Sequence, residues 1–234
     1  MKIARIVAGA LNALCLAVFL LAVSIQVPSL NMWFYRYQFN KNQTYAVLRM
    51  DEESLHNVAR SLIDYLRGDL DSLHGVRAVV NGQERQFFSG DVNNDEIGHM
   101  EDVLELFLIG LLARDIAGWG FLATLAVCIL LGRKEAVPQL LALWRGFALF
   151  CLTAFAVLGG LIALNFNRAF TIFHEMFFVD NWTFNPRSSL MINMLPNQFF
   201  MDIAAFIIIM FVSFLIITVI LTTVLRRMLL KNAG

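Results

Sequence analysis

Four long apolar stretches constrain this chain more than any other feature of its sequence. They extend over about residues 6–27, 106–131, 140–164 and 199–225. The hydrocarbon core of a bilayer is about 30 Å thick, and about 20 helical residues cross it at roughly 1.5 Å each. Each stretch therefore predicts a transmembrane helix, and together they predict a mainly α fold built on a four-transmembrane-helix bundle.

The composition agrees with a membrane protein, because 59% of the residues are hydrophobic and only 15% are charged. Residues 22–24 (AVS) loosely resemble a signal-peptide cleavage site, but the apolar run before them is long for such a peptide. An uncleaved anchor is favoured. Cys15, Cys128 and Cys151 all lie inside the apolar stretches, where a thiol packs as a small hydrophobe, so no disulfide, metal or thiol chemistry is predicted.

Basic residues near the ends of the stretches predict the orientation, because such residues are held on the cytoplasmic side. They precede the first stretch, separate the second from the third and follow the fourth: Lys2, Arg5, Arg133, Lys134, Arg226, Arg227 and Lys231. Both termini are expected in the cytoplasm. The extracytoplasmic segments are then about 28–105 and 165–198, and the first carries 13 of the 18 acidic residues but 7 of the 18 basic ones.

The segment between the first two spans predicts a small extracytoplasmic cap. Asp51 can cap an amphipathic helix that Gly68 can end, and its apolar residues recur on one face: Leu55, Val58, Leu62, Ile63 and Leu66. Residues 76–80 and 83–88 flank Asn81-Gly82, which predicts a short β-hairpin. No repeat or flexible linker interrupts the chain, so we expect a single membrane domain over residues 1–234.

Two further local signals flank this cap. Trp33, Tyr35 and Tyr37 are typical of an interfacial aromatic belt. Asn93 and Glu96 have the spacing of a capping box, which predicts that the second membrane helix begins outside the bilayer.

All four histidines lie in the two extracytoplasmic segments. His56 lies beside the apolar stripe of the amphipathic helix and His74 precedes a glycine, so solvated or structural roles are favoured for both. His99 is followed by Asp102 three residues later, where a carboxylate could orient the ring, although two polar groups on a solvated helix face give the same spacing.

His174 lies in an aromatic segment, residues 170–178, just after the third span. Large apolar side chains outside a span indicate contact with lipid or a lipid-binding groove. If His99 and His174 meet over a shared cavity, two imidazoles can divide the roles of base and acid near neutral pH, as acyl transfer from an ester requires.

Ionisable residues inside membrane spans are functional candidates, although ion pairing or snorkelling is equally compatible with them. Arg114 and Asp115 lie in the second span and Asp202 lies at the start of the fourth. Because sequence neighbours face apart on a helix, Arg114 is expected to pair with Asp202 or with substrate. Arg145 is expected to snorkel to the cytoplasmic surface.

Several segments resemble the lipoprotein intramolecular transacylases, the Lit family. The segments are residues 96–103 (EIGHMEDV), Leu106-Phe107, residues 173–178 (FHEMFF), Trp182 and Leu195-Pro196. The resemblance extends to the four-span layout and to one histidine in each extracytoplasmic segment, and it covers nearly the whole chain.

The resemblance implies a bacterial plasma-membrane enzyme that acts on diacylglyceryl lipoproteins and moves the sn-2 acyl chain to the α-amino group of the N-terminal cysteine, giving the lyso form. The proposed catalytic histidines of the family match His99 and His174. Supporting roles for Asp102, Arg114, Glu175 and Trp182 are expected from their positions; of these, Arg114 or backbone amides are candidates to stabilise the oxyanion. No cofactor, metal or nucleic-acid partner is expected, and a transient acyl-histidine stays an alternative.

Two other functions remain open at this point. A metal-dependent membrane hydrolase could use His99, His174 and Glu175, although these residues lack the His-Glu-x-x-His arrangement and no third ligand stands out. A non-catalytic membrane sensor or assembly factor could instead bind a partner through the acidic cap.

Overall fold

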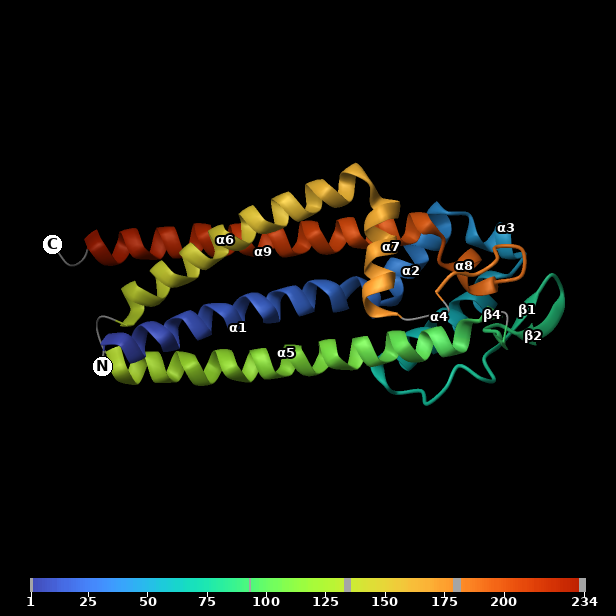
Figure 1. Cartoon of the computed structure of the whole chain (residues 1–234), viewed down its shortest axis with the longest axis horizontal. Coiled ribbons are helices and arrows are strands. Elements are labelled where there is room, and N and C mark those ends of the chain that lie inside the picture. The colour runs from blue at the N-terminus through green and yellow to red at the C-terminus, as the bar shows by residue number, and fades with distance from the viewer. Residues whose placement is uncertain (1, 93, 133–135, 179–181, 232–234) are drawn as a thin grey trace. The chain divides into compact units, whose positions relative to one another are not determined.

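The computed structural model describes residues 2–92, 94–132, 136–178 and 182–231 (Figure 1). The chain divides into two compact units. The bundle unit comprises Met1–Ile25, Leu111–Leu164 and Ile207–Gly234, and the α/β unit comprises Gln26–Gly110 and Asn165–Phe206. Three of the long helices contribute residues to both units, and each unit is described by itself below.

Four helices are long and apolar enough to cross a membrane, as the sequence predicts. They are α1 (Lys2–Ser29), α5 (Glu96–Gly132), α6 (Ala136–Leu164) and α9 (Asn197–Lys231). Each predicted apolar stretch falls within one of them, which confirms the four-helix prediction. Arg133 and Lys134, which support the predicted orientation, lie outside the described residues.

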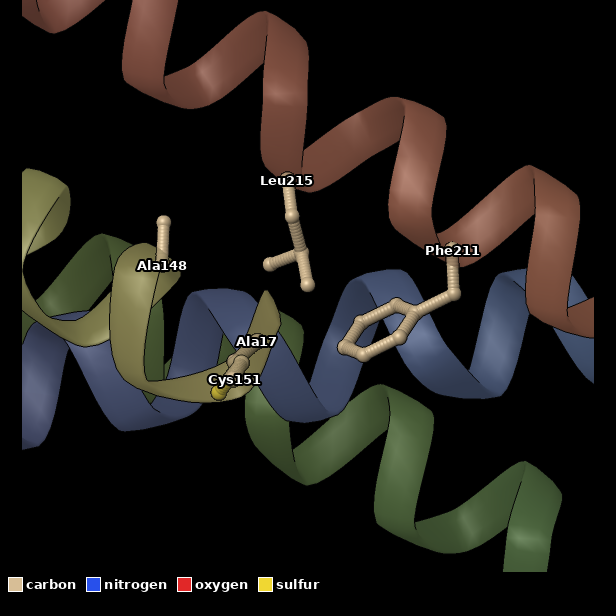
Figure 2. Close-up of a cluster of buried hydrophobic side chains, with 5 residues drawn as sticks. All are labelled: Ala17, Ala148, Cys151, Phe211 and Leu215. Carbon is tan, nitrogen blue, oxygen red and sulfur yellow. The ribbon is translucent and has the colours of Figure 1, made fainter. Parts of the chain in front are cut away.

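Small side chains from α1 and α6 pack with larger ones from α9 in the core of the bundle unit. Figure 2 shows Ala17 of α1, Ala148 and Cys151 of α6, and Phe211 and Leu215 of α9, all buried. Small residues allow helix backbones to approach closely, which matters in lipid because apolar burial alone does not distinguish a neighbouring helix from an acyl chain. Cys151 thus packs as a small apolar side chain, in agreement with the sequence.

A buried asparagine connects three helices of the bundle unit. Asn12 of α1 donates through Nδ2 to the Phe121 carbonyl oxygen at 2.7 Å and to the Thr124 hydroxyl at 2.9 Å, both on α5. Its Oδ1 accepts a hydrogen bond from Trp144 Nε1 of α6 at 2.8 Å. Asn12 is fully buried, so these bonds satisfy polar groups that water cannot reach.

We predict that Asn12→Ala destabilises the protein, because it removes three hydrogen bonds and leaves the Trp144 N–H without its partner. Hydrogen bonds between membrane helices contribute roughly 0.6 to 2 kcal/mol each. Thermal unfolding in detergent should show a clear fall in the melting temperature. Leu11→Ala, which truncates an exposed neighbour on α1, is the matched control; an equal fall in both variants would contradict a special role for Asn12.

The α/β unit contains the amphipathic helix that the sequence predicts. This helix, α4 (Glu52–Arg67), starts at Asp51, whose carboxylate accepts from the Ser54 backbone N–H at 2.7 Å. It ends at Gly68, whose φ of 81° is accessible to glycine with little strain. The predicted apolar face is buried, and Leu55 and Leu62 are among the largest fully buried side chains.

The predicted hairpin is also present. Strand β1 (Arg77–Val80) pairs antiparallel with β2 (Gln83–Gln86), with Val80 opposite Gln83. Asn81 and Gly82 have φ values of 52° and 75°, the double positive combination of a two-residue hairpin turn. A second short ribbon, β3 (Gly90–Asp91) with β4 (Asn94–Asp95), was not predicted.

One part of the predicted aromatic belt is wrong. Residues 32–41 form the helix α2 (Met32–Lys41), which exposes Trp33 and Tyr37 but buries Tyr35 in the core of the α/β unit. The Tyr35 hydroxyl donates to the Ser29 carbonyl oxygen at 2.9 Å. The helical twist explains the difference, because residues 33 and 37 lie on one face and residue 35 does not.

Helices also occupy most of the segment after the third span. They are α7 (Phe166–Phe177), which contains His174, and the short α8 (Leu190–Met194). Another short helix, α3 (Thr44–Leu48), follows α2. The sequence predicts the aromatic character of residues 170–178 but not their helical conformation.

Candidate active site

The first candidate histidine lies in the first turn of α5. Asn93, which the sequence predicts as the helix cap, lies outside the described residues. Asp95 caps the helix: its Oδ1 accepts from the Gly98 backbone N–H at 2.9 Å. A Cβ atom at position 98 would collide with this carboxylate, so a larger residue there would displace the Asp95 cap directly before His99.

The second candidate histidine lies near the end of α7. Asn165 begins this helix by accepting a hydrogen bond from the Arg168 backbone N–H at 3.0 Å. The last backbone bond runs from Phe178 N–H to the His174 carbonyl oxygen at 2.8 Å. His174 therefore belongs to the final, regular turn of a capped helix.

The structure brings these two imidazoles together inside the α/β unit. The ring centroids of His99 and His174 are 6.1 Å apart, and the ring planes differ by 21°. Phe178 contacts both rings, at 4.8 Å from His99 and 5.3 Å from His174. The side chains are 7% and 8% exposed, so both rings are nearly removed from water.

Other aromatic rings surround the histidines. Phe184 lies 5.5 Å from the His99 ring. Phe170 and Trp182 lie 4.0 and 5.1 Å from the His174 ring. The sequence indicates this aromatic environment through its composition, but the individual contacts depend on the turn of α7 and on the path of the loop after it.

Hydrogen bonding distinguishes the two rings. His174 Nδ1 lies 2.8 Å from the Phe170 carbonyl oxygen, and because a carbonyl only accepts, Nδ1 carries the proton. Nε2 then has a free lone pair and can accept a proton. His99 Nδ1 is buried and has no hydrogen-bond partner among the described residues, an arrangement that costs free energy unless another group pairs with it.

Burial favours the neutral form of His174. Desolvation lowers the pKa of its imidazole, and the carbonyl of Phe170 opposes this effect by hydrogen-bonding to the ring. The loss of hydration is the larger of the two effects. A neutral imidazole with its Nδ1 proton held in place can accept a proton at Nε2.

A family profile and solved structures match this chain. The profile described as "Lipoprotein intramolecular transacylase Lit" matches residues 10–200. The chain belongs to the Lit family. It is therefore an acyltransferase of the lipoprotein intramolecular transacylase type and a multi-pass membrane protein.

The fold of this Lit protein is similar to solved structures of the membrane integral lipoprotein intramolecular transacylase Lit from Bacillus cereus. One has a TM-score of 0.73 at 19% identity and covers 100% of this chain and 99% of that chain. A form with a histidine replaced by arginine gives 0.68 at 19% identity, with 100% and 93% covered. A histidine-to-alanine form gives 0.70 at 19% identity, with 99% and 96% covered. A search of the curated proteins found no match.

The structure does not bring Asp102 to the His99 ring of this Lit protein, although the sequence predicts that they share a face. Asp102 is exposed, and neither a hydrogen bond nor an ion pair involves it among the described residues. The first turns of α5 bury Ile97, His99 and Met100 but turn Asp102 outward. Glu175 is likewise exposed.

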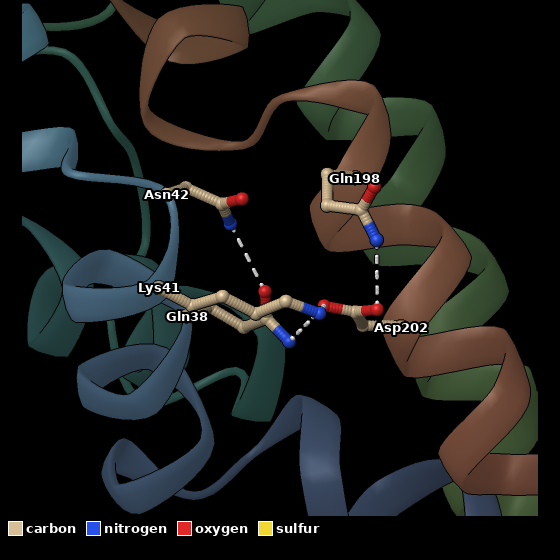
Figure 3. Close-up of polar contacts among 5 residues, drawn as sticks. All are labelled: Gln38, Lys41, Asn42, Gln198 and Asp202. Carbon is tan, nitrogen blue, oxygen red and sulfur yellow. Dashed lines mark hydrogen bonds and ion pairs between the residues drawn. The ribbon is translucent and has the colours of Figure 1, made fainter.

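The expectation that Arg114 needs a partner other than its sequence neighbour is wrong. Arg114 pairs with its sequence neighbour Asp115, at 2.7 Å between Nη2 and Oδ1, because the long arginine side chain bends back to it. Asp202 accepts hydrogen bonds from Lys41 Nζ, from Gln38 Nε2 at 2.9 Å and from Gln198 Nε2 at 2.9 Å. Figure 3 shows that these contacts tie α2 to the start of α9.

The other two histidines have different contacts from those of His99 and His174. His56 is buried, and its Nε2 lies 3.0 Å from the Tyr45 hydroxyl. His74 is exposed. In the part of the chain that the structure describes, no three His, Cys, Asp or Glu side chains gather closely enough to hold a metal ion.

Glu96 is a site-supporting residue that the sequence identified only as a capping-box position. Its fully buried carboxylate accepts from the Ser89 backbone N–H at 2.9 Å and from Asn94 Nδ2 at 3.4 Å. The Ser189 hydroxyl and the Met191 backbone N–H also hydrogen-bond to it. These donors join the start of α5 to the segment that follows the aromatic loop.

We predict that Glu96→Gln destabilises this Lit protein by about 1 to 3 kcal/mol, because the amide N–H2 group faces donors that need an acceptor. Thermal unfolding in detergent would measure the change. The control Glu105→Gln makes the same chemical change at an exposed position of α5 and should stay within about 0.5 kcal/mol of the wild type. Equal stability of both variants would show that the hydrogen bonds from the four donors to the carboxylate do not stabilise the fold.

Proposed function

We propose that this Lit-family enzyme transfers the sn-2 acyl chain of an S-diacylglyceryl lipoprotein to the α-amino group of its N-terminal cysteine, producing the lyso form. The observation that supports this proposal is the pair of buried imidazoles of His99 and His174, whose ring centroids lie 6.1 Å apart among aromatic side chains. The matching structures with a substituted histidine in a relative agree with a role for such a residue.

The reaction exchanges one bond for another within a single molecule. The amine nitrogen attacks the ester carbonyl carbon, an amide bond forms, and the bond from that carbon to the glycerol oxygen breaks. The nitrogen loses one proton and the glycerol oxygen gains one, so no oxidant, hydride donor or cofactor is needed. Because ester and amine are already joined, holding them in attack geometry can contribute roughly 7 to 11 kcal/mol.

His174 is our candidate for the base. Its Nδ1 proton is held by Phe170, which leaves Nε2 to take a proton from the attacking amine. A free α-amino group has a pKa of about 7.7 to 8.0, close enough to that of an imidazole for such a transfer near neutral pH. His99 is our candidate for the acid toward the departing glycerol oxygen. Burial and the neighbouring His174 lower the pKa of the His99 imidazole to about 4, so the resting ring is neutral and donates only after it receives the proton that His174 takes from the amine. The proton lost by the nitrogen thus ends on the glycerol oxygen, and the pair holds the same number of protons before and after the reaction.

Apolar surroundings favour this substrate. The rings of Phe178, Phe184 and Trp182 offer contact surface to acyl chains and exclude the water that would hydrolyse the ester instead. The basic residues at the ends of the spans support a cytoplasmic position for both termini and an extracytoplasmic position for the histidines.

The direct test is expression in a bacterium that lacks N-acylating enzymes, followed by mass spectrometry of N-terminal lipopeptides. The wild-type chain should convert diacylglyceryl lipoproteins to the lyso form. His99→Ala and His174→Ala should each lower the conversion by about 100-fold or more, since a positioned acid or base contributes at least that much.

His74→Ala is the matched control, because it removes an exposed imidazole from the same α/β unit. It should convert lipoproteins as the wild type does. Unchanged lipopeptides in cells with good membrane expression of the wild-type chain would rule out the proposed reaction, and full activity of both site variants would rule out the assigned residues.

We also predict an acid-shifted pH dependence. Desolvation lowers the pKa of His174 below its ordinary value of 6.5, so the neutral base persists at pH values where a solvated imidazole is mostly protonated. The profile of kcat/KM, measured with detergent-solubilised substrate, should therefore show two losses of activity on acidification: one from protonation of the substrate amine near pH 7.7 to 8.0, and a second, from His174, below pH 6.5. A second loss at or above pH 6.5, or none down to pH 4, would argue that His174 is not the base.

A further inference from the structure

Helix α7 exposes a row of large apolar side chains in addition to carrying His174. Ile172, Phe173 and Phe177 are each 47% exposed, and Met176 is 68% exposed. We call these four residues the apolar face of α7. Exposing four adjacent large apolar side chains to water is unfavourable, so this face indicates contact with an apolar environment.

The opposite side of α7 is polar. Residues 172, 173, 176 and 177 recur at the spacing of one helical face, whereas Asn167, Thr171 and Glu175 recur at a spacing of four on another. His174 lies at the border between the two and turns into the α/β unit, where it is buried. This pattern is typical of a helix that lies at the boundary between lipid and water.

The chain itself indicates which apolar environment covers the face. Helix α7 begins at Phe166, two residues after the membrane-crossing helix α6 ends at Leu164. Leu164 is 84% exposed, so the lipid-facing surface of the span continues to its last residue. Acyl chains of the bilayer are thus available at the point where the apolar face starts.

We propose that the apolar face of α7 lies in the acyl-chain region at the membrane boundary, and that diacylglyceryl groups reach His174 from the lipid along this face. The second part rests on the proposed function, and the first part does not. His174 would then meet an ester at the depth where glycerol esters of membrane lipids occur, while the polar side of α7 stays in water.

The depth of the helix can be measured without any reaction. The native Cys15, Cys128 and Cys151 are replaced by alanine, and a single cysteine is introduced as Met176→Cys or as Glu175→Cys. Each variant is labelled with the fluorophore NBD and placed in nanodiscs of dioleoylphosphatidylcholine that contain lipids brominated on the acyl chains. Aqueous iodide serves as the opposing quencher.

We expect brominated chains to quench the label at position 176 several-fold more than the label at position 175, and iodide to show the reverse order. Strong iodide quenching at position 176 would show that water covers the face. Protection from both quenchers would show that protein covers it, for example a second copy of the chain. Either result overturns the proposal.

A second measurement tests access of substrate. Met176→Lys places an ammonium group in the apolar face and should lower lyso-lipoprotein formation by about tenfold, because the charge disfavours insertion among acyl chains. Val79→Lys makes a comparable change at an exposed position of β1 and should keep wild-type activity. Melting temperatures of both variants in detergent verify that they are folded.

The two measurements separate the possible failures. The label at position 176 could be quenched by brominated acyl chains while the wild-type chain makes no lyso lipoprotein. This outcome would support the membrane position of α7 and reject the proposed function. Full activity of Met176→Lys in an active enzyme would reject access along this face and leave the proposed function intact.

Discussion

The candidate site depends on one buried acidic group. The carboxylate of Glu96 gathers hydrogen-bond donors from residues before α5 and from the segment at residues 189–191. A carboxylate without water must find such donors within the protein, so its position fixes where these separate parts of the chain meet. His99 follows one turn later, and the loop with Trp182 and Phe184 leads into the same segment. The placement of both rings therefore starts from a polar contact, although the site itself is mostly apolar.

Burial shapes the chemistry of the histidine pair. A hydrated imidazole changes charge near pH 6.5, whereas an imidazole among phenylalanine and tryptophan rings is held neutral. For acyl transfer to an amine this is useful, because a neutral ring accepts a proton and an enclosed ester meets the amine before it meets water. The Phe170 carbonyl completes the arrangement by fixing the tautomer of His174, which requires α7 to be helical up to its last turn.

The sequence predicts those parts of the fold that depend on local patterns. Span lengths follow from bilayer thickness, α4 follows from its cap and apolar spacing, and the hairpin follows from Asn81-Gly82. The sequence predicts Tyr35 at the membrane interface, whereas the structure buries it. Its burial depends on how α2 packs on other elements, which the local sequence does not reveal. The pairing of Arg114 with Asp115 was missed because a long side chain can bend to a neighbour that the helix backbone turns away.

The candidate site shows the same division between local and long-range information. His99 and His174 are 75 positions apart in the sequence, and no local pattern places them together; the resemblance of their segments to Lit-family motifs is what predicts the pair. The spacing of three residues predicts that Asp102 lies beside the His99 ring. In the structure its side chain instead lies at the surface of α5. Glu96 shows the opposite case, since a residue with an ordinary capping role in the sequence proves to be fully buried among donors from distant segments.

Different interactions stabilise the bundle unit and the α/β unit. In the bundle unit, small side chains and the contacts of Asn12 hold helices together where apolar burial supplies little selectivity. In the α/β unit, a core of aromatic and aliphatic residues with capped helices keeps two imidazoles out of water. Because the described contacts of both rings lie within the α/β unit, changes in the bundle core should act on stability, whereas changes around the rings should act on the rate of acyl transfer.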